Sequence, residues 1–268
     1  MYRKIMGFLE AWKESKHRKP LILQGARQVG KTYSILEFGR THYENVAYFN
    51  FETNPKLNET FEENISPDYL IPILSHIAGQ TIVKEKTLMV FDEVQLCERA
   101  LTSLKYFCEN APDYHIIVAG SLLGVAVNRT KFSFPVGKVD MKTLYPMDME
   151  EFMMALGEDD LVNQIKKCFQ TDTPLPSALH DAAMQLYRQY LVVGGMPECV
   201  MQFAGTKDYI LVRHTQDTIL ASYLNDMSKY NTLNEIKKTR LAYDNITVQL
   251  SKKNTRFQYK LIKKGGRA

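Results

Sequence analysis

The sequence predicts an α/β fold in which a five-stranded parallel sheet is flanked by helices. Between Pro20 and about Leu144, short runs of β-branched and aromatic residues alternate with longer helical patterns, which is typical of a parallel sheet with crossover helices. Beyond Pro146 the pattern becomes helical throughout. A chain of 268 residues, 45% of them hydrophobic, is long enough to bury a sizeable core. We therefore expect a sheet domain followed by a helical region.

The candidate strands are short apolar runs separated by turns and helical patterns. They cover residues 21–23, 46–51, 88–91, 116–119 and 139–144. After the first run, a helix is expected over residues 32–38. In the long stretch between the second and third runs, one helix is expected over residues 69–79, where Leu70, Ile73, Leu74 and Ile77 fall on one face.

The second half of the chain carries clear signals for where helices begin and end. Asp148 stands at a helix start, with further acids in the first turn that favour the positive end of the helix dipole. Residues 171–176 contain two prolines and predict a loop. Gly194, Gly195 and Pro197 predict a break, because glycine pairs and proline do not continue a helix.

The positive charge of the chain is concentrated at its C-terminal end. The formal net charge is +4, yet every charged residue after Asp244 is basic. These residues are Lys252, Lys253, Arg256, Lys260, Lys263, Lys264 and Arg267. Without them the chain is slightly acidic, so only this tail suggests a polyanionic partner such as duplex DNA.

Cysteine spacing and hydropathy exclude several classes of protein. Cys97, Cys108, Cys168 and Cys199 lie far apart and form no CxxC pair, so neither a disulfide scaffold nor a zinc site is indicated. No apolar run approaches the roughly 18 residues of a membrane span. We therefore expect a cytoplasmic protein without a membrane partner.

A glycine-rich motif follows the first expected strand and opens the next helix. It matches GxxxxGK[ST] and consists of Gly25, Ala26, Arg27, Gln28, Val29, Gly30, Lys31 and Thr32. Such a loop turns backbone N–H groups around a β-phosphate, and the helix N-terminus adds positive potential. Lys31 is expected to reach the β- and γ-phosphates, and Thr32 to offer its hydroxyl to Mg²⁺. The motif therefore predicts ATP binding with Mg²⁺.

Two acids end the third expected strand. Asp92 and Glu93 follow the apolar run 88–91, and the carboxyl end of that strand should lie at the same sheet edge as the phosphate loop. Asp92 is predicted to hold Mg²⁺, and Glu93 to orient or deprotonate the attacking water. An apolar strand followed by two solvated acids is the alternative interpretation.

Other residues have two or three interpretations each. Ser121, at the end of the strand 116–119, is a candidate sensor of the γ-phosphate or a cap of the following helix. Arg129 is a candidate for stabilising the transition state, in this subunit or a neighbouring one, or a solvated arginine. Arg27 contacts phosphate, a partner or solvent. Phe8 and Trp12 belong to a helix that either packs on the core or closes over the adenine.

Together these motifs resemble those of a prokaryotic family of AAA-type ATPases that carry a C-terminal domain of unknown function. The resemblance lies in residues 18–32, 91–95, 119–121, 134–138, 144–146 and 193–198. It implies an ATP-binding P-loop NTPase core over residues 1–146, a helical region over 147–232 and a partial winged helix-turn-helix over 233–268. It also implies a chain truncated within its C-terminal part.

The function expected from these features is Mg²⁺-dependent ATP binding with slow hydrolysis that serves as a conformational switch. The alternative is a nucleotide-gated module for DNA binding or protein interaction with negligible turnover. Either function is compatible with a homo-oligomer or a protein partner. A small-molecule phosphotransferase is disfavoured, because the sequence offers neither a second substrate site nor a mobile arginine lid.

Overall fold

The computed structural model describes residues 1–120, 135–228, 233–252 and 258. These residues divide into two compact units, Met1–Asp208 and Tyr209–Ala268, and each is considered by itself. The sequence predicted a three-part division with boundaries after residues 146 and 232, and that division stays a prediction.

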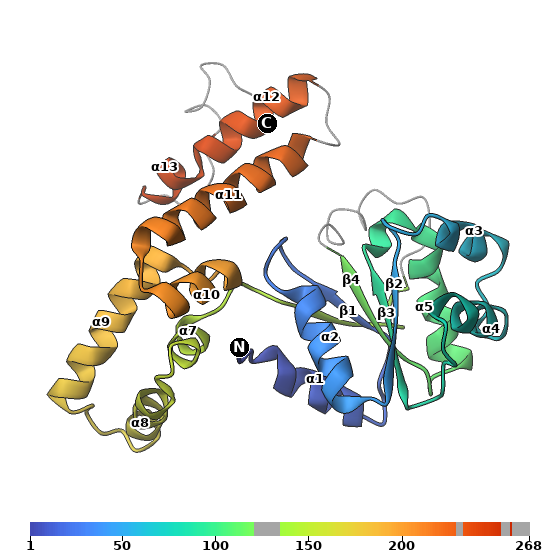
Figure 1. Ribbon diagram of the computed structural model, residues 1–268, viewed down its shortest axis with the longest axis horizontal. Helices are drawn as coiled ribbons and strands as arrows, with labels where there is room; N and C mark the ends of the chain where they lie inside the picture. Colours follow the sequence, from blue (N-terminus) through green and yellow to red (C-terminus); the bar gives the residue numbers. More distant parts are fainter. Residues whose placement is uncertain (121–134, 229–232, 253–257, 259–268) are drawn as a thin grey trace. The chain divides into compact units, whose positions relative to one another are not determined.

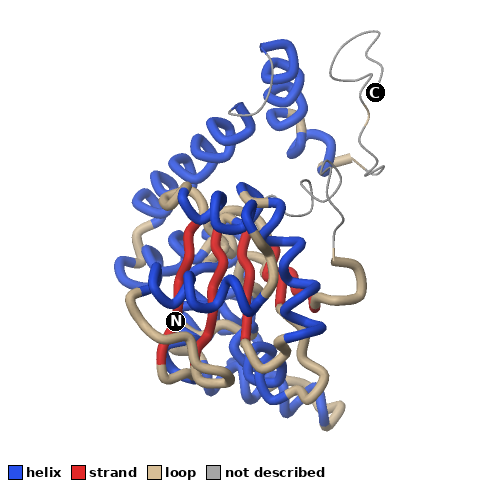
Figure 2. The backbone as a smooth tube through the Cα atoms, turned by 90° about the vertical axis from the view of Figure 1, so that its right-hand side faces the viewer, coloured by secondary structure: helices blue, strands red, loops and turns tan. Residues whose placement is uncertain are grey.

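The first unit is built on a five-stranded parallel sheet (Figures 1 and 2). Its strands are β1 (Leu21–Gln24), β2 (Asn45–Asn50), β3 (Thr87–Asp92), β4 (His115–Gly120) and β5 (Asp140–Thr143). The strand order is β2-β3-β4-β1-β5, so the first strand lies between the fourth and the fifth. The five-stranded parallel sheet predicted from the sequence is confirmed.

Helices cover both faces of this sheet (Figure 1). The helices α1 (Ile5–Glu14) and α2 (Lys31–His42) pack on one face. The other face carries α3 (Lys56–Glu63), α4 (Pro67–Ala78) and α5 (Glu98–Asn110). Because successive strand residues point to opposite faces, a strand buried on both sides must be apolar at every position.

Strand β3 shows this double burial directly. Leu88 and Val90 belong to the core shared with α1 and α2, whereas Met89 and Phe91 belong to the core shared with α3, α4 and α5. All four side chains are fully buried. The continuous apolar run that marked this strand in the sequence is therefore a consequence of the three-layer architecture.

The helix predicted over residues 69–79 is α4, which begins two residues earlier and ends before Gly79 in the left-handed conformation, φ +65°. Helix α3 was not predicted. It buries Leu57 and Phe61, and these two positions alone are too few for a helical period to be recognised. Phe61 contacts Phe91 edge-to-face across the core, so tertiary packing stabilises this helix.

The helical part of the first unit contains α7 (Met149–Ala155), α8 (Asp159–Gln170), α9 (Ser177–Val193) and α10 (Pro197–Thr206). Asp148 caps α7 as predicted, and it forms a capping box with Glu151. The ring of Phe152 packs between those of Tyr190 and Phe203, so α7 is held against α9 and α10. The loop at 171–176 and the break before Pro197 also match the prediction.

The second unit contains the helices α11 (Tyr209–Ser228), α12 (Leu233–Asp244) and α13 (Ile246–Leu250). The region expected to form a partial winged helix, residues 233–268, therefore contains α12 and α13 among its described residues. The winged helix itself is not confirmed, because residues 253–257 and 259–268 lie outside the described residues. Among the described residues, no helix combines the length and the apolar character needed to cross a membrane.

Candidate nucleotide-binding site

The glycine-rich motif forms the connection between β1 and α2, where it was predicted. Gly25 has φ +154°, and a Cβ at this position would lie 2.2 Å from the backbone oxygen of Leu144, so the close approach requires glycine. Gly30 has φ +89° and immediately precedes α2. The loop therefore delivers the chain directly to the N-terminus of a helix, which is the arrangement that favours anion binding.

Lys31 is the first residue of α2, and its side chain turns back onto the loop. It is only 8% exposed. Its ammonium group donates hydrogen bonds to the backbone oxygens of Gly25, at 2.9 Å, and Ala26, at 2.7 Å. Burial lowers the pKa of Lys31 below its usual range, while the carboxylates of Glu93 and Asp92 raise it. An added anion in this loop would also favour the charged form of Lys31.

Asp92 ends β3 as predicted, and its carboxylate joins two hydroxyl groups. Thr32 Oγ1 and the Tyr48 hydroxyl each donate to Asp92 Oδ2 at 2.8 Å. Asp92 is 5% exposed, so this oxygen-rich cluster is largely shielded from solvent. Burial raises the pKa of Tyr48 to about 12, and the hydrogen bond to Asp92 acts in the same direction.

Tyr48 was missed by the sequence reasoning. It lies in β2, which pairs with β3 so that Asn50 is aligned with Asp92. The pairing of these two strands determines which side chain lies beside Asp92. An apolar run predicts a strand but does not predict its neighbour in the sheet. The available signal was a tyrosine near the carboxyl end of a strand.

Glu93 differs from Asp92 in its backbone conformation and its partners. Its φ is +52°, in the left-handed region, where a residue other than glycine loses about 1–2 kcal/mol. Its N–H donates to Asp92 Oδ1 at 3.0 Å, and its carboxylate accepts a hydrogen bond from Gln95. It precedes a short 3-10 helix, η1 (Val94–Leu96). A strained backbone at a pocket is a reason to suspect function.

A cavity of about 510 Å³ brings these groups together. The cavity is lined by seven of the residues that the sequence predicted for the site: Arg27, Gln28, Gly30, Lys31, Thr32, Asp92 and Glu93. Further lining residues come from the N-terminal residues, α2 and α10, and the sequence analysis assigned none of them to the site individually. They are Met1, Arg3, Tyr33, Ser34, Pro197, Glu198 and Met201. The run 193–198, which carries part of the family resemblance, was the feature of the sequence that could have placed Pro197 and Glu198 at the site.

The other predicted site residues have different outcomes. Gly25, Ala26 and Val29 contribute backbone oxygens to the hydrogen bonds that shape the loop. Ser121 and Arg129, the candidate sensor and transition-state arginine, lie outside the described residues and stay predictions.

The helix that contains Phe8 and Trp12 is α1, and it packs on the core. Trp12 is 5% exposed, and its ring meets that of His115 edge-to-face. Burial lowers the pKa of His115 to about 4, so this histidine is neutral at physiological pH. The cavity is lined by Met1 and Arg3 from this part of the chain. Closure of Phe8 or Trp12 over an adenine is thus not supported by the geometry.

The strand order, the phosphate-loop position and the acids at the end of β3 define an AAA-type P-loop NTPase fold. Residues 17–153, more than half of the chain, match the family described as AAA domain. The chain belongs to this family. Residues 184–268 match a domain of unknown function, DUF8612. No curated protein sequence matches the chain.

Solved structures with a similar fold are distant from this chain. Caenorhabditis elegans PCH-2 is 11% identical, with a TM-score of 0.41 over 92% of this chain and 68% of its own. The RuvB Holliday junction branch migration motor of Thermotoga maritima is 13% identical, with a TM-score of 0.40 over 88% and 66%. AMPPCP-bound DnaA from Aquifex aeolicus is 11% identical, with a TM-score of 0.39 over 97% and 80%.

Proposed function

We propose that this protein binds ATP with Mg²⁺ in the cavity at the phosphate loop and hydrolyses it slowly to ADP and phosphate. The observation that carries the proposal is that Lys31, Thr32, Asp92 and Glu93 line one cavity. They come from two segments of the chain about sixty residues apart, and parallel pairing brings the ends of β1 and β3 to the same edge.

The loop and the start of α2 suit the phosphate groups. Backbone N–H groups near Gly30 and the helix N-terminus supply positive potential, and Lys31 adds a full charge. In the present arrangement the Lys31 ammonium bonds to loop carbonyl oxygens, which are weaker partners than phosphate oxygens. We therefore expect Lys31 to exchange these partners for phosphate oxygens when ATP binds.

The residues around Asp92 fit Mg²⁺. Asp92 and Thr32 offer only oxygen atoms, which are the ligands this ion prefers, and their present contact at 2.8 Å supports a site that both residues share. The ion, when bound, would offset the negative charge that develops on the phosphate oxygens. Tyr48 would keep the Asp92 carboxylate oriented through its hydrogen bond.

Glu93 is the proposed general base. Its carboxylate would accept a proton from the attacking water as the new bond to the γ-phosphorus forms and the bond to the β,γ-bridging oxygen breaks. Gln95 donates a hydrogen bond to Oε2 of this carboxylate, which orients the group and leaves Oε1 to take the proton.

The use of hydrolysis as a switch is supported by the far wall of the cavity. Pro197, Glu198 and Met201 belong to α10, which packs on α7 and α9. A nucleotide in the cavity would touch α10, so its presence would bias the position of the helical region relative to the sheet. Negligible turnover with nucleotide-dependent binding of a partner is the alternative, and measuring phosphate release decides between the two.

The decisive experiment is titration of Lys31→Ala with ATP and Mg²⁺. We expect a loss of affinity of about 10- to 100-fold, the range for one hydrogen bond between charged groups. Lys86→Ala is the matched control, because Lys86 is an exposed lysine that precedes β3 at the opposite edge of the sheet. Unfolding curves establish that both variants are folded. Equal affinity of Lys31→Ala and the unaltered protein would refute ATP binding at this loop.

A further inference from the structure

Arg3 is a buried cation in the wall of the nucleotide cavity, and the proposed chemistry does not use it. It is 4% exposed and precedes α1. Its guanidinium makes three separate contacts: Nε to Glu151 at 3.1 Å, Nη1 to the Val29 oxygen at 2.8 Å, and Nη2 to the Tyr145 oxygen at 2.8 Å. One side chain thus joins the phosphate loop to the segment that leads into α7.

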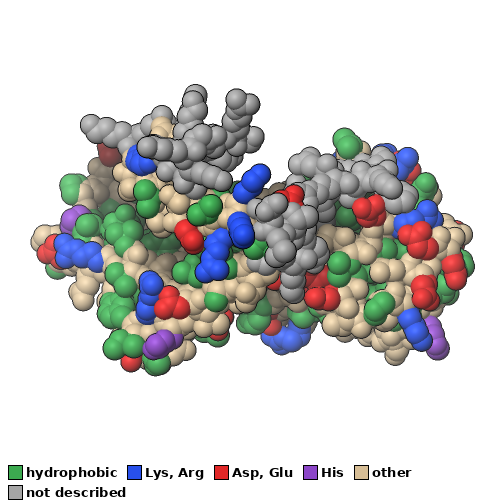
Figure 3. All heavy atoms as spheres, turned by 90° about the horizontal axis from the view of Figure 1, so that it is seen from above, with side chains coloured by type: hydrophobic (Ala, Val, Ile, Leu, Met, Phe, Trp, Pro, Cys, Tyr) green, Lys and Arg blue, Asp and Glu red, His purple; other side chains and the backbone are tan. Residues whose placement is uncertain are grey.

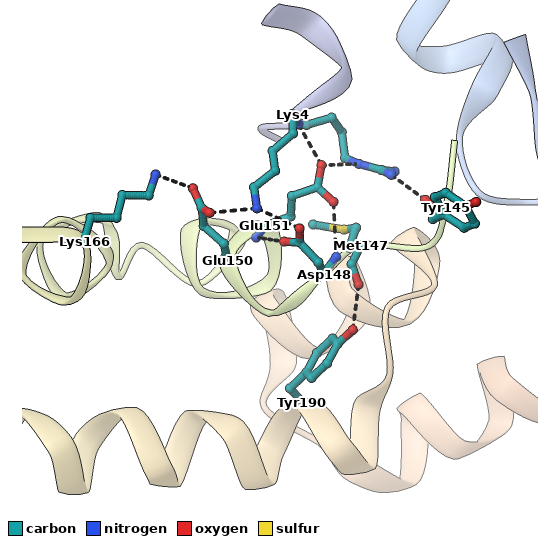
Figure 4. Close-up of polar contacts among 9 residues, drawn as sticks. Lys4, Tyr145, Met147, Asp148, Glu150, Glu151, Lys166 and Tyr190 are labelled. Atoms are coloured by element: carbon teal, nitrogen blue, oxygen red, sulfur yellow. Dashed lines mark hydrogen bonds and ion pairs between the residues drawn. The ribbon is translucent and has the colours of Figure 1, made fainter. Parts of the chain in front are cut away.

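The charge of Arg3 is balanced by Glu151, which is 5% exposed. Glu151 also accepts hydrogen bonds from the backbone N–H groups of Lys4, at 2.7 Å, and Asp148, at 3.2 Å (Figure 4). Its carboxylate is therefore held from three sides. Because a guanidinium is planar and rigid, a fixed Glu151 also fixes the direction of the other Arg3 donors.

The contact with Val29 bears on the phosphate loop through the geometry of the peptide bond. The Val29 oxygen and the Gly30 N–H belong to one planar trans peptide, in which they point in opposite directions. A guanidinium that holds this oxygen on one side therefore turns the Gly30 N–H toward the other. Gly30 has φ +89°, and because glycine tolerates most backbone angles, this residue itself contributes little to fixing the peptide.

We propose that Arg3 is a positioning residue that presets the Gly30 N–H for the phosphate groups of a bound nucleotide. The inference rests on the proposed nucleotide-binding function. Arg3 acts here through the backbone of the loop, because its charge is already paired with Glu151. Arg3 also connects the phosphate loop to Tyr145 and to Glu151 of α7 by hydrogen bonds. Each of these segments therefore helps to hold the other in place.

The test must separate this role from a general loss of stability. Arg3→Met leaves Glu151 buried without its partner, which is itself destabilising. The double variant Arg3→Met with Glu151→Gln removes both charges and keeps one oxygen, which can replace Glu151 Oε1 as the acceptor from the Lys4 N–H. Lys4→Met is the matched control, because the Lys4 ammonium pairs with Asp148 and Glu150 at the start of α7 and its removal leaves the Arg3 contacts in place.

Affinities for ATP and ADP are measured by titration for each protein, with unfolding curves alongside. Both Arg3 variants should bind ATP and ADP about tenfold more weakly, by the same factor for each, since the Gly30 N–H serves a phosphate that both nucleotides carry. Lys4→Met should retain the affinity of the unaltered protein.

Two results would overturn the proposal. Recovery of full affinity in the double variant would mean that Arg3 only balances Glu151. A loss confined to ATP would mean that Arg3 contacts the terminal phosphate directly. Failure of the unaltered protein to bind either nucleotide would instead refute the proposed function, and this inference with it.

Discussion

Neighbouring acids at the end of β3 occupy different environments, and their roles should differ accordingly. Asp92 is buried and accepts hydrogen bonds from Thr32 and Tyr48, so its carboxylate is fixed in place. Glu93 is partly exposed, has a left-handed backbone and accepts from Gln95. A fixed carboxylate suits a metal ligand, and a more accessible one suits proton transfer from water.

At the scale of the residue, we expect Glu93→Gln to bind Mg²⁺ and ATP normally and to lose turnover by about 100-fold or more, the usual contribution of a general base. Asp92→Asn should instead lose the Mg²⁺ dependence of ATP binding. The measurements are nucleotide titration with and without Mg²⁺, and release of phosphate over time. Normal hydrolysis by Glu93→Gln would show that another group, such as Ser121, positions the water.

At the scale of the element, a tight contact orients α10 toward the cavity. Gly195 lies between α9 and α10, and its oxygen accepts a hydrogen bond from the Met147 N–H at 2.6 Å. A Cβ on Gly195 would lie 2.1 Å from the Met147 oxygen, which also accepts from the Tyr190 hydroxyl. Backbone oxygen cannot yield as the end of a flexible side chain can. This contact therefore determines where Pro197 and Glu198 begin the next helix.

We predict that Gly195→Ala destabilises the protein by about 1–3 kcal/mol, the usual cost of overpacking, and also weakens nucleotide binding because α10 is displaced. Gly205→Ala, within α10, is the control, because an added methyl group there meets nothing within 4 Å. It should be neutral or stabilising by up to about 1 kcal/mol. Urea unfolding and ATP titration measure both effects. If Gly195→Ala matched Gly205→Ala in both, α10 would not depend on this contact.

At the scale of the whole molecule, the distribution of charge distinguishes the C-terminal tail from the rest. On the face shown in Figure 3, Lys and Arg side chains of the described residues are interspersed with acidic ones. Every charged residue after Asp244 is basic, and among them only Lys252 lies within the described residues. The tail is therefore the part of the chain that we propose for contact with duplex DNA.

If the tail contacts DNA phosphates, binding should weaken steeply with salt, by about 0.9 in log K per unit log[salt] for each phosphate neutralised. Changing Lys263 and Lys264 to Glu should flatten this slope and leave ATP binding intact. Changing the exposed Lys16 and Lys56 of the first unit to Glu alters the net charge equally and serves as the control. Duplex affinity is measured over a salt series.

The competing account of the tail is a solvated face, or a lever that acts on the ATPase part. Salt-insensitive binding, or no binding, by the unaltered chain would favour the solvated face. A change of ATP turnover in the Lys263 and Lys264 variant, without a change in DNA affinity, would favour the lever.

Local patterns in the sequence were sufficient for the sheet and for the centre of the candidate site. Strand β3 could be predicted because burial on both faces requires an unbroken apolar run. The loop around Lys31 could be predicted because the spacing of its glycines controls the backbone directly. The start of α7 could be predicted because Asp148 caps it through a hydrogen bond to the nearby Glu151 N–H. In each case the information lies within a few residues of the feature.

Tertiary structure alone decided which distant residues support the candidate site. Tyr48 reaches Asp92 because β2 pairs with β3, and Arg3 reaches Val29 because α1 packs beside the loop. Helix α3 forms because Phe61 has a place in the core, although only two apolar residues, Leu57 and Phe61, mark it in the sequence. Such contacts depend on the order and packing of elements far apart in the chain. No local propensity encodes them, because their free energy arises only when both partners are already in place.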